Sequence, residues 1–335
     1  MSHGAPAARR IAIAIGDPNG IGPEIALAAA GHFAADPRLE PVLVGDVRVI
    51  EHHAAARGER VRLVPFDPDR HRDGAIAFEP VEALAGEAFC PGRLDPRAGA
   101  ATVAYAARAV ALAQSGQVDA VVGCPHSETA INRAGIAFSG YPGLVAELTG
   151  TPPDRVFLML AAAGLRIGHV TLHERLADAL LRLTPELVAR AATACVESLR
   201  RLGLADPSVA VFGINPHAGE DGLFGDDDKR VTRPAVEALR AAGIDAHGPA
   251  GADVLLGARR HDLYVAMYHD QGHVPIKLVS PHRASALAVG APVLFSSVGH
   301  GCAFDIAGTG RADPTSVVET LALLGGLHPV QERSA

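Results

Sequence analysis

The sequence predicts an α/β fold with parallel strands, divided into more than one domain. Short apolar runs of strand type alternate with Ala-rich helical segments along most of the chain, which is the pattern of βαβ units. The 335 residues exceed what one hydrophobic core usually holds. Hydrophobic residues make up 48% and charged residues 20%, which is the composition of a folded globular protein.

The first part of the chain alternates strands and helices up to a polar turn near residue 125. Strands are predicted over 11–15, 41–44, 61–64 and 120–122, and helices over 24–30, 47–57 and 99–114. The segment 66–96 is rich in Pro, Asp and Gly and is predicted to be irregular. The turn Gly16–Ile25 places Pro23 in the first turn of a helix, where proline is well tolerated. A helix N-terminus after such a turn can hold an anion, and a plain strand-to-helix connection is the alternative.

The second part of the chain continues this alternation. Strands are predicted over 156–160, 166–171, 209–214, 263–267 and 293–297, and helices over 185–201, 232–242 and 315–324. A turn at Ala161–Gly164 joins the first two of these strands. Thr184 is expected to cap the helix that begins at Pro185, and Glu186 in its first turn suits the helix dipole.

Charge and composition exclude several classes of function. The net charge is −7, aromatic residues make up 4% and Trp is absent, which argues against binding nucleic acid. Residues 1–10 lack the apolar core of a signal peptide, and no apolar run reaches the ~18 residues of a membrane span. The four cysteines form no Cys-x-x-Cys pair, so neither a zinc–thiolate site nor a disulfide framework is indicated. We expect a cytoplasmic protein without a nucleic-acid or membrane partner.

Three predicted strands lead into a histidine with polar neighbours. These histidines are His173 beside Glu174, His217 two residues after Asn215, and His269 beside Asp270. Imidazole is the commonest protein ligand for a transition metal, and ligands bind at the carboxyl ends of strands in α/β sheets. The three side chains are therefore candidates for one catalytic metal site. The alternative is that each is a satisfied core or loop residue.

Other polar groups near these strand ends have competing interpretations. His269 and His273 have helical i,i+4 spacing, although Pro275 predicts that any helix there is short. Lys277 stands in an apolar run, either as a snorkelling surface residue or as a group for anion binding or proton transfer. Cys124 and His126 lack an evident orienting partner, which disfavours a thiol nucleophile. Asp226–Asp228 could bind a cation, but a solvated loop is preferred.

Four motifs spread along the chain are typical of one protein family. They are GDPNGIGPEI at 16–25, NPHAGE at 215–220, YHDQG at 268–272 and DIAGTGRAD at 305–313. Through them the chain resembles the 4-hydroxythreonine-4-phosphate dehydrogenase family over nearly its whole length. The resemblance implies a two-domain α/β/α fold like that of isocitrate and isopropylmalate dehydrogenases. It also implies a homodimer, with the site in the interdomain cleft at the dimer interface.

The resemblance further implies cofactors and domain limits. It implies NAD or NADP and a divalent metal, with zinc preferred, on His173, His217 and His269. One domain would comprise residues 1–125 and 296–335 and carry the nucleotide-binding loop, and the other, residues 126–295, would carry the metal ligands and dimer contacts. The cofactor-binding residues would be His300, Gly301, Asp305, Ala307 and Gly308.

Departures from the biosynthetic pattern of the family point to a different substrate. Tyr141 and Pro142 stand where that pattern has a His-Thr pair for the substrate, and Phe295 stands where it has an Arg for the substrate phosphate. Loss of an Arg removes charge-assisted recognition of phosphate. The runs at 124–142, 211–218, 261–278 and 296–301 resemble instead the branch that oxidises cis-dihydrodiols in terephthalate catabolism.

The branch implies NAD-linked oxidative decarboxylation of a cis-dihydrodiol carboxylic acid. Terephthalate dihydrodiol would give protocatechuate, CO2 and NADH. The candidate bases are Lys277, Asp270 and Asp253 in falling order, and the substrate-binding candidates are His126, Tyr141, His273 and Lys277. The alternatives are the biosynthetic dehydrogenase acting on the phosphate ester, and a member of the fold that binds a metal or ligand without catalysis.

Overall fold

The α/β fold expected from the alternation of strands and helices is confirmed, and the chain forms two units. The computed structural model describes residues 8–58, 61–69, 74–84 and 89–327. The first unit contains the described residues up to Thr149 and those from Pro292 onwards, and the second contains Gly150–Ala291. The sequence placed the limits at 125 and 295, but α4 (Glu128–Arg133) and α5 (Tyr141–Thr149) pack on α3 (Pro96–Gln114) of the first unit.

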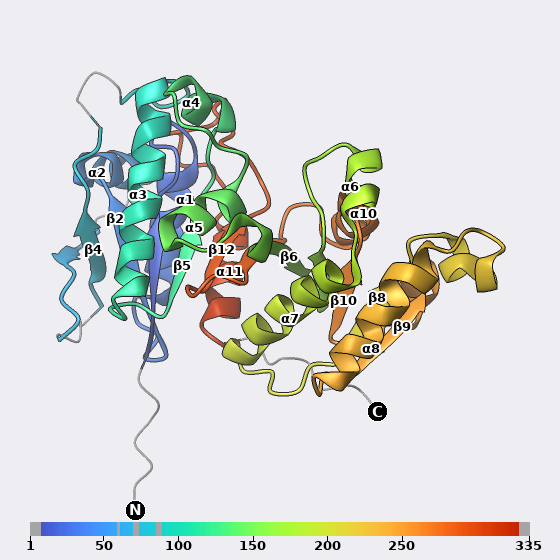
Figure 1. Ribbon diagram of the computed structural model, residues 1–335. Coiled ribbons are helices and arrows are strands. Elements are labelled where there is room, and N and C mark those ends of the chain that lie inside the picture. The colour runs from blue at the N-terminus through green and yellow to red at the C-terminus, as the bar shows by residue number, and fades with distance from the viewer. Residues whose placement is uncertain (1–7, 59–60, 70–73, 85–88, 328–335) are drawn as a thin grey trace, which may run out of the picture. The chain divides into compact units, whose positions relative to one another are not determined.

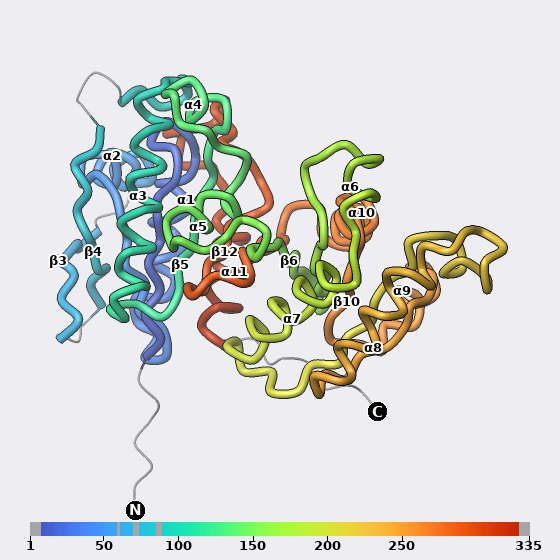
Figure 2. The backbone as a smooth tube through the Cα atoms, viewed as in Figure 1, coloured from blue at the N-terminus to red at the C-terminus, as the bar shows by residue number. Residues whose placement is uncertain are grey.

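Neighbouring strands of the first unit pair in parallel, in the order β3-β4-β2-β1-β5-β12. Their bounds are β1 Arg9–Ala14, β2 Leu39–Gly45, β3 Leu63–Pro65, β4 Ile76–Pro80, β5 Ala120–Gly123 and β12 Phe295–Val298. β3 and β4 lie at the edge of this sheet (Figure 2). β4 falls within the segment predicted to be irregular, so that prediction was wrong for these five residues.

Helices cover both faces of the strands in the first unit. Their bounds are α1 Gly22–Phe33, α2 Val47–Ala56, α3, α4, α5 and α11 Thr315–Leu324. α3 contacts β1, β2 and β5 (Figure 1), and it begins where the Asp95 carboxylate accepts a hydrogen bond from Arg97 N. Cover on both faces explains why β1 is apolar throughout its centre, with Ile11 and Ile13 fully buried.

The order of the first-unit strands creates a switch point between β1 and β5. The chain passes from β1 to β2 in one direction and from β4 across to β5 in the other, so right-handed crossovers put α1 and α3 on opposite faces. Ligands of open α/β sheets bind in the crevice at such a point. The turns after the two strands meet there, where Asp17 N donates to Pro125 O at 2.9 Å.

The second unit has a mixed sheet in the order β11-β6-β7-β10-β8-β9. The bounds are β6 Phe157–Ala162, β7 Leu165–His169, β8 Val209–Phe212, β9 Ala246–Ala250, β10 Leu263–Ala266 and β11 Ser285–Val289. β6 pairs antiparallel with β11 and β7, whereas β7, β10, β8 and β9 pair in parallel. Leu160, Ile167, Phe212 and Tyr264 are among the residues that pack in its core.

The helices of the second unit include one that the sequence predicted to be short. Their bounds are α6 Leu176–Arg182, α7 Pro185–Arg201, α8 Arg233–Ala241, α9 Ala252–Ala258 and α10 His269–Val279. The predicted Thr184 cap is present, accepting from Leu187 N at 3.2 Å. α10 continues for eleven residues with Pro275 inside it, so the expectation of a short helix was wrong. Within the described ranges, no helix is both long and apolar enough to cross a bilayer.

Candidate active site

The three histidines predicted to bind a metal follow three neighbouring strands of the second unit. β7, β10 and β8 are adjacent and parallel, so their carboxyl ends lie at one edge of the sheet. His173 follows β7, His269 follows β10 and His217 follows β8. β7 ends at His169, four residues before His173, so His173 lies on a loop and is exposed. The topology thus brings three histidine-bearing segments to one edge.

His173 and His269 lie together in one pocket. Their ring centroids are 5.3 Å apart and the ring planes are inclined at 45°. Both side chains line a pocket of about 510 Å³, together with Glu174, Tyr268, Asp270 and the apolar Leu172, Leu176 and Ala179. Two imidazoles beside carboxylates and apolar walls can bind a small polar ligand.

His217 is presented by a loop with an unusual backbone. Residues His217 to Asp221 all have positive φ, between 42° and 86°, which non-glycine residues adopt at a cost. The His217 side chain is 73% exposed, and its Nδ1 lies 2.9 Å from Glu220 Oε2. A backbone held in this conformation over several residues requires firm anchoring at its ends.

Asp228 supplies that anchoring. Its side chain is buried and accepts hydrogen bonds from Ile214 N at 2.8 Å, Asn215 N at 3.0 Å and Thr232 Oγ1 at 2.6 Å. Asn215 Nδ2 also donates to Asp227 Oδ2 at 3.0 Å. The acidic segment was predicted to be a solvated loop, and for Asp228 this was wrong because the carboxylate satisfies two backbone N–H groups.

Two of the three predicted metal ligands, His269 and His217, have a carboxylate beside Nδ1, which the sequence did not reveal and which suits binding of a divalent metal. His269 Nδ1 lies 2.6 Å from Asp270 Oδ1, just as His217 Nδ1 lies close to Glu220. An imidazole whose Nδ1–H donates to a carboxylate presents Nε2 as the ligand atom. No group of three or more His, Cys, Asp or Glu in the described part of the chain gathers closely enough to hold a metal. The three-ligand set stays a prediction.

One face of α10 carries His269, His273 and Lys277 at successive four-residue intervals. The rings of His269 and His273 are stacked, with centroids 3.7 Å apart and planes within 12°, which confirms the helical pair considered from the sequence. Lys277 is half-buried and donates to Pro281 O at 3.5 Å. Burial lowers the pKa of Lys277, which favours its neutral, proton-accepting form.

Sequence reasoning missed His169, which lies fully buried beneath this face. Its Nε2 is 3.1 Å from His273 Nδ1, and its Nδ1 is 3.3 Å from Leu158 O. Burial lowers the pKa of His169 to about 3 and that of His273 to about 4, so both rings are neutral. Because Leu158 O can only accept, His169 Nδ1 donates to it and His169 Nε2 accepts from His273. The remaining nitrogen of His273, Nε2, therefore carries a lone pair.

The other two candidate bases are less well placed for proton transfer. Asp270 is exposed, and its carboxylate contacts the His269 imidazole. This contact suits Asp270 to orienting His269 and not to taking a proton from the substrate. Asp253 lies exposed in the first turn of α9. Neither has the half-buried setting of Lys277.

The substrate candidates of the first unit belong to an aromatic cluster, here defined as His126, Phe138, Tyr141 and Phe295. The His126 ring packs edge-on against Phe138 and Tyr141 at 4.9 and 4.5 Å, and Tyr141 lies 4.9 Å from Phe295. The Tyr141 hydroxyl donates to Cys124 O at 3.0 Å inside the core. Burial lowers the pKa of His126 to about 4, so this imidazole is a neutral polar group among aromatic rings.

Two further observations concern residues near this cluster. Gly123 is required there, because a Cβ would lie 2.7 Å from Tyr141 Cζ and 2.9 Å from Phe295 Cζ. The Cys124 thiol is fully buried, and burial raises its pKa, which agrees with the expectation that Cys124 and His126 form no nucleophilic dyad.

The residues predicted to bind the cofactor lie within residues 299–313, which form nearly all of the loop between β12 and α11 and are here called loop 299–313. His300 Nε2 lies 2.5 Å from Ser316 Oγ at the start of α11. Gly301 and Asp305 are exposed, whereas Ala307 and Gly308 are partly buried. Gly308 has φ 74°, and a Cβ there would lie 3.0 Å from Pro91 Cβ. The loop thus combines close backbone packing at Gly308 with an exposed carboxylate at Asp305, and its binding of the cofactor stays a prediction.

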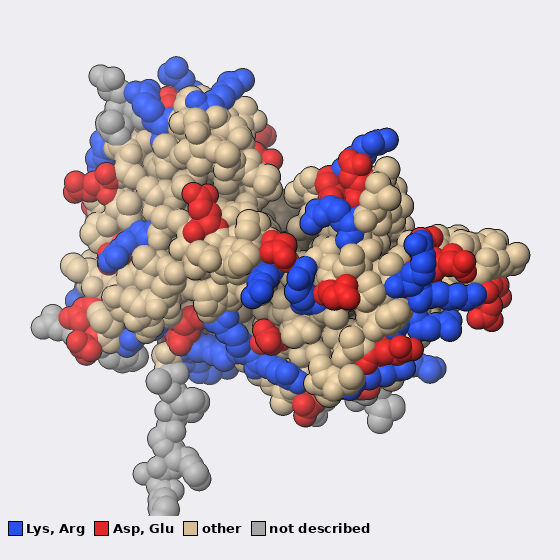
Figure 3. All heavy atoms as spheres, viewed as in Figure 1, with Lys and Arg blue, Asp and Glu red and all other residues tan. Residues whose placement is uncertain are grey.

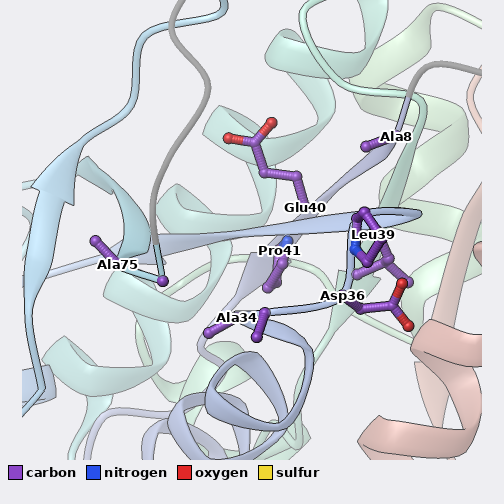
Figure 4. Close-up of a pocket in the computed structure, with 10 residues that line it drawn as sticks. Ala8, Ala34, Asp36, Leu39, Glu40, Pro41 and Ala75 are labelled. Atoms are coloured by element: carbon purple, nitrogen blue, oxygen red, sulfur yellow. The ribbon is translucent and has the colours of Figure 1, made fainter.

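A separate pocket of the first unit lies away from these residues. It has a volume of about 280 Å³ and is lined by residues that include Ala34, Asp36, Leu39, Glu40 and Ala75 (Figure 4). Leu39 and Glu40 begin β2, so the pocket lies at the amino end of that strand. Since ligands of parallel sheets bind at the carboxyl ends, this pocket is a poor candidate for the active site.

Lys, Arg, Asp and Glu side chains are interspersed on the visible face of each unit (Figure 3).

Comparison with known proteins agrees with the motifs found in the sequence. Residues 38–324 match the model of the family described as pyridoxal phosphate biosynthetic protein PdxA. A 1,2-dihydroxy-3,5-cyclohexadiene-1,4-dicarboxylate dehydrogenase from a Comamonas species is 51% identical over 95% of this chain and 97% of its own. D-threonate 4-phosphate dehydrogenase from Cupriavidus necator is 41% identical over 93% and 95%.

Solved structures give the same assignment. A terephthalate 1,2-cis-dihydrodiol dehydrogenase from Burkholderia xenovorans is 50% identical, with a TM-score of 0.74 over 95% of this chain and 98% of that one. A 4-hydroxythreonine-4-phosphate dehydrogenase from Burkholderia phymatum is 36% identical, with a TM-score of 0.84 over 96% and 98%. These matches confirm the resemblance to the family and to its dihydrodiol branch. The chain therefore belongs to the family of the pyridoxal phosphate biosynthetic protein PdxA.

Proposed function

We propose that this protein catalyses the NAD-linked oxidative decarboxylation of a cis-dihydrodiol carboxylic acid. Terephthalate dihydrodiol is the proposed substrate, and protocatechuate, CO2 and NADH are the products. The identity of 51% with the Comamonas dehydrogenase, against 41% with the phosphate-ester enzyme from Cupriavidus necator, favours this substrate class.

Phe295 is the observation that carries the choice of substrate. It stands where the resemblance places the Arg that binds the substrate phosphate, and it is fully buried against Tyr141. A phosphate ester needs charge-assisted donors, and a buried phenyl ring supplies none. Phe138, Tyr141 and Phe295 are buried, so within this cluster the partly buried, neutral His126 is the group proposed to contact the substrate.

We assign the diol to the second unit and the nicotinamide cofactor to loop 299–313 of the first. His173, His217 and His269 would hold the metal, with zinc preferred. When bound, the metal supplies a Lewis acid and the cofactor supplies the hydride acceptor. Glu220 and Asp270 orient His217 and His269 through their Nδ1 atoms.

Lys277 is the proposed base for the hydroxyl proton. Its pKa is lowered by burial, so a larger fraction is neutral than for an exposed lysine. His273 presents the lone pair of Nε2 and is suited to accept a hydrogen bond from a hydroxyl group of the diol. The pairing of His273 with a ring carboxylate, considered from the sequence, would require a proton on that nitrogen.

A homodimer is part of the proposal, as the resemblance implies. The segments that carry the three histidines also carry strongly exposed apolar side chains. Leu181 on α6 is 84% exposed, Leu278 on α10 is 78% and Leu223 beside the His217 loop is 73%. Exposed apolar side chains of this size mark interaction surfaces. Replacement of Leu181 and Leu278 by Glu should yield a monomer in analytical ultracentrifugation with greatly reduced turnover; an unchanged dimer would contradict this surface.

The substrate class is tested with the purified protein, NAD and three substrates. We expect NADH formation with terephthalate cis-dihydrodiol and none with 4-hydroxythreonine-4-phosphate or D-threonate 4-phosphate. Release of CO2 and protocatechuate, measured by chromatography, confirms decarboxylation. Turnover only with a phosphate ester would contradict the proposal, and absence of NADH with every substrate would favour a non-catalytic binding protein.

The roles of the second unit are tested with a chelator and two histidine variants. Dialysis against a chelator should abolish NADH formation, and zinc should restore it. His217→Ala should abolish turnover without changing the melting temperature, because the side chain is exposed. His247→Ala is the matched control, since His247 is also exposed and also contacts a carboxylate, Asp245. Normal turnover by the His217 variant would refute the metal assignment.

A further inference from the structure

The motif Gly16–Ile25 has a structural use that the sequence left open. Its polar side chains Asp17, Asn19 and Glu24 are all fully buried, although the motif consists of a turn and the first turn of α1. Asp and Glu are almost never fully buried unless they have partners. Because carboxylates repel an anion, Asp17 and Glu24 also disfavour the anion site that was considered for this motif in the sequence analysis. The partners of these side chains therefore indicate what the motif does.

Asn19 binds the turn to a neighbouring loop at residues 90–93. Its Oδ1 accepts from Cys90 N at 2.7 Å, its Nδ2 donates to Arg93 O at 3.0 Å, and its own carbonyl accepts from Gly92 N at 2.7 Å. This second loop packs in turn against loop 299–313, because a Cβ on Gly92 would lie 2.9 Å from Phe304 O. The motif thus supports loop 299–313 indirectly.

Two hydrogen bonds join the motif to loop 299–313 directly. Ile21 N donates to Cys302 O at 2.9 Å, and Ala312 N donates to Glu24 Oε1 at 2.7 Å. These contacts lie near the two ends of the loop, and the predicted cofactor residues Asp305 to Gly308 lie between them. The bond from Ala312 joins residues 288 positions apart and involves a charged acceptor, which makes it the stronger type.

The surroundings of Glu24 show that its carboxylate is incompletely satisfied. Its Oε2 has no hydrogen-bond partner among the described residues, and neither has His53 Nδ1, which lies 4.0 Å away. Burial lowers the pKa of His53 to about 4, so this imidazole is neutral. Arg57 Nη1 is 3.9 Å from Oε1. A buried carboxylate with an unpartnered oxygen costs stability, which argues that its contact with Ala312 serves a purpose beyond folding.

We propose that Glu24 is a positioning residue that holds loop 299–313 in the conformation that binds the nicotinamide cofactor. It acts through the backbone N–H of Ala312 and touches neither cofactor nor substrate. The inference rests on the proposed function, because it takes loop 299–313 as the cofactor site. It goes beyond that proposal in giving the motif Gly16–Ile25 a role in cofactor affinity.

Two substitutions separate the reach of the carboxylate from its charge. Glu24→Asp keeps the charge but is shorter by one C–C bond, about 1.5 Å, so it cannot reach Ala312 N. Glu24→Gln loses the charge but keeps an oxygen at the position that accepts from Ala312. The Asp variant should raise the Kd for NADH and the KM for NAD about tenfold, the usual effect of losing one charge-assisted hydrogen bond. The Gln variant keeps the hydrogen bond, so its Kd for NADH and its KM for NAD should remain within about twofold of the wild-type values.

The matched control is Asp46→Asn in the same unit. Asp46 is another buried carboxylate that accepts backbone hydrogen bonds, from Ala83 N and Leu84 N, but it does not contact loop 299–313 through them. NADH binding is measured by fluorescence titration, and amide hydrogen exchange of residues 302–313 by mass spectrometry. We expect faster exchange in Glu24→Asp alone, with kcat and the KM for the diol nearly unchanged.

The outcomes distinguish this inference from the proposed function. Wild-type protein that fails to bind NADH overturns the cofactor assignment and the inference with it. Wild-type binding with unchanged affinity in Glu24→Asp overturns the inference alone. Equal losses in Glu24→Asp and Asp46→Asn, or equal losses in the Asp and Gln variants, also overturn it, because stability or charge would then explain the effect.

Discussion

The Nδ1 atom of His273 lies 3.1 Å from Nε2 of the buried His169, and this contact and the one at 3.3 Å to His269 O favour the proton on Nδ1. His169→Leu removes one of these two acceptors, so the proton is held less firmly on Nδ1 and a larger fraction of His273 presents an N–H at Nε2 in place of a lone pair. We expect the KM for the diol to rise about tenfold, as for the loss of one hydrogen bond to a polar group. Steady-state kinetics with the dihydrodiol at saturating NAD measures this change.

A conservative variant shows whether the effect comes from the hydrogen bond or from packing. His169→Gln can accept from His273 through its amide oxygen, so it should recover most of the lost affinity. If the Leu and Gln variants have the same KM and differ only in melting temperature, His169 is a packing residue and its proposed effect on His273 is wrong.

Gly272 permits α10 to approach His169. A Cβ on Gly272 would lie 2.3 Å from His169 Nε2. Gly272→Ala should therefore lower the free energy of unfolding by roughly 1–3 kcal/mol through overpacking, even though Ala favours a helix. Denaturant unfolding measures the change. Gly257→Ala on α9 is the control, because a Cβ there meets nothing within 4 Å, and it should be neutral or stabilising. A stabilising Gly272→Ala would contradict the close approach.

Much of this arrangement could be predicted from the sequence, because it depends on local pattern. Apolar runs alternating with helices predicted the α/β fold, and the histidines that follow two of the strands, His173 and His269, lie in one pocket. His169 was missed for a physical reason. It lies inside the strand run Leu165–His169, where its neighbours are apolar, and only the pairing of β7 with β10 brings it beneath α10.

Contacts between distant segments were the main part that the sequence could not supply. The bond from Ala312 to Glu24 and the bonds of Asp228 to the His217 loop join segments that no local periodicity connects. The full length of α10 was also underestimated, because Pro275 is tolerated inside a helix that packs against β6, β7 and β10.

Tyr141 was predicted to bind substrate, and its hydroxyl already has a partner in the core. Tyr141→Phe removes the donor to Cys124 O and should cost about 1 kcal/mol of stability, with little change in the KM for the diol. His126→Ala should instead raise that KM, because the imidazole is only partly buried and its ring contacts are aromatic. Kinetics and thermal unfolding of both variants provide the comparison. A larger KM effect from Tyr141→Phe than from His126→Ala would place the phenol, and not the imidazole, against the substrate.

The buried carboxyl group of Asp17 should make the free energy of unfolding depend on pH in mildly acidic solution. Burial raises the pKa of its carboxyl from 3.8 to about 6, with the Asp95 charge adding to the increase and the hydrogen bond from Asn19 N opposing it. The folded protein therefore holds this proton more tightly than the unfolded chain. Stability contributed by the group is present below pH 4 and is lost as the pH rises from about 4 to about 6. The loss amounts to roughly 3 kcal/mol for a shift of this size.

Asp17→Asn lacks this titration, so the difference between the two proteins isolates it. The free energy of unfolding is measured by denaturant at several values between pH 4 and pH 7. The stability of the wild type relative to Asp17→Asn should fall across this range and level off above about pH 6. A difference that does not vary with pH would show that Asp17 titrates normally in the fold.

Glu220 provides a test of the metal site that does not depend on turnover. Its carboxylate lies 2.9 Å from His217 Nδ1, and both side chains are largely exposed, so the pair adds little to stability. If His217 binds zinc through Nε2, Glu220→Gln weakens the hold on the imidazole and lowers metal affinity by about 10- to 100-fold. The melting temperature of the metal-free protein should not change. Competition with a fluorescent zinc chelator measures the affinity.

The chain offers a chemically matched control in His247 and Asp245, whose Nε2 and Oδ1 atoms lie 2.9 Å apart on the surface. Asp245→Asn removes the same type of contact from a histidine with no predicted metal role, so its zinc affinity should equal that of the wild type. A loss in Glu220→Gln alone identifies Glu220 as the group that orients a metal ligand. Equal zinc affinity in wild type and Glu220→Gln would remove His217 from the ligand set, since an imidazole that binds a metal depends on the partner of its other nitrogen.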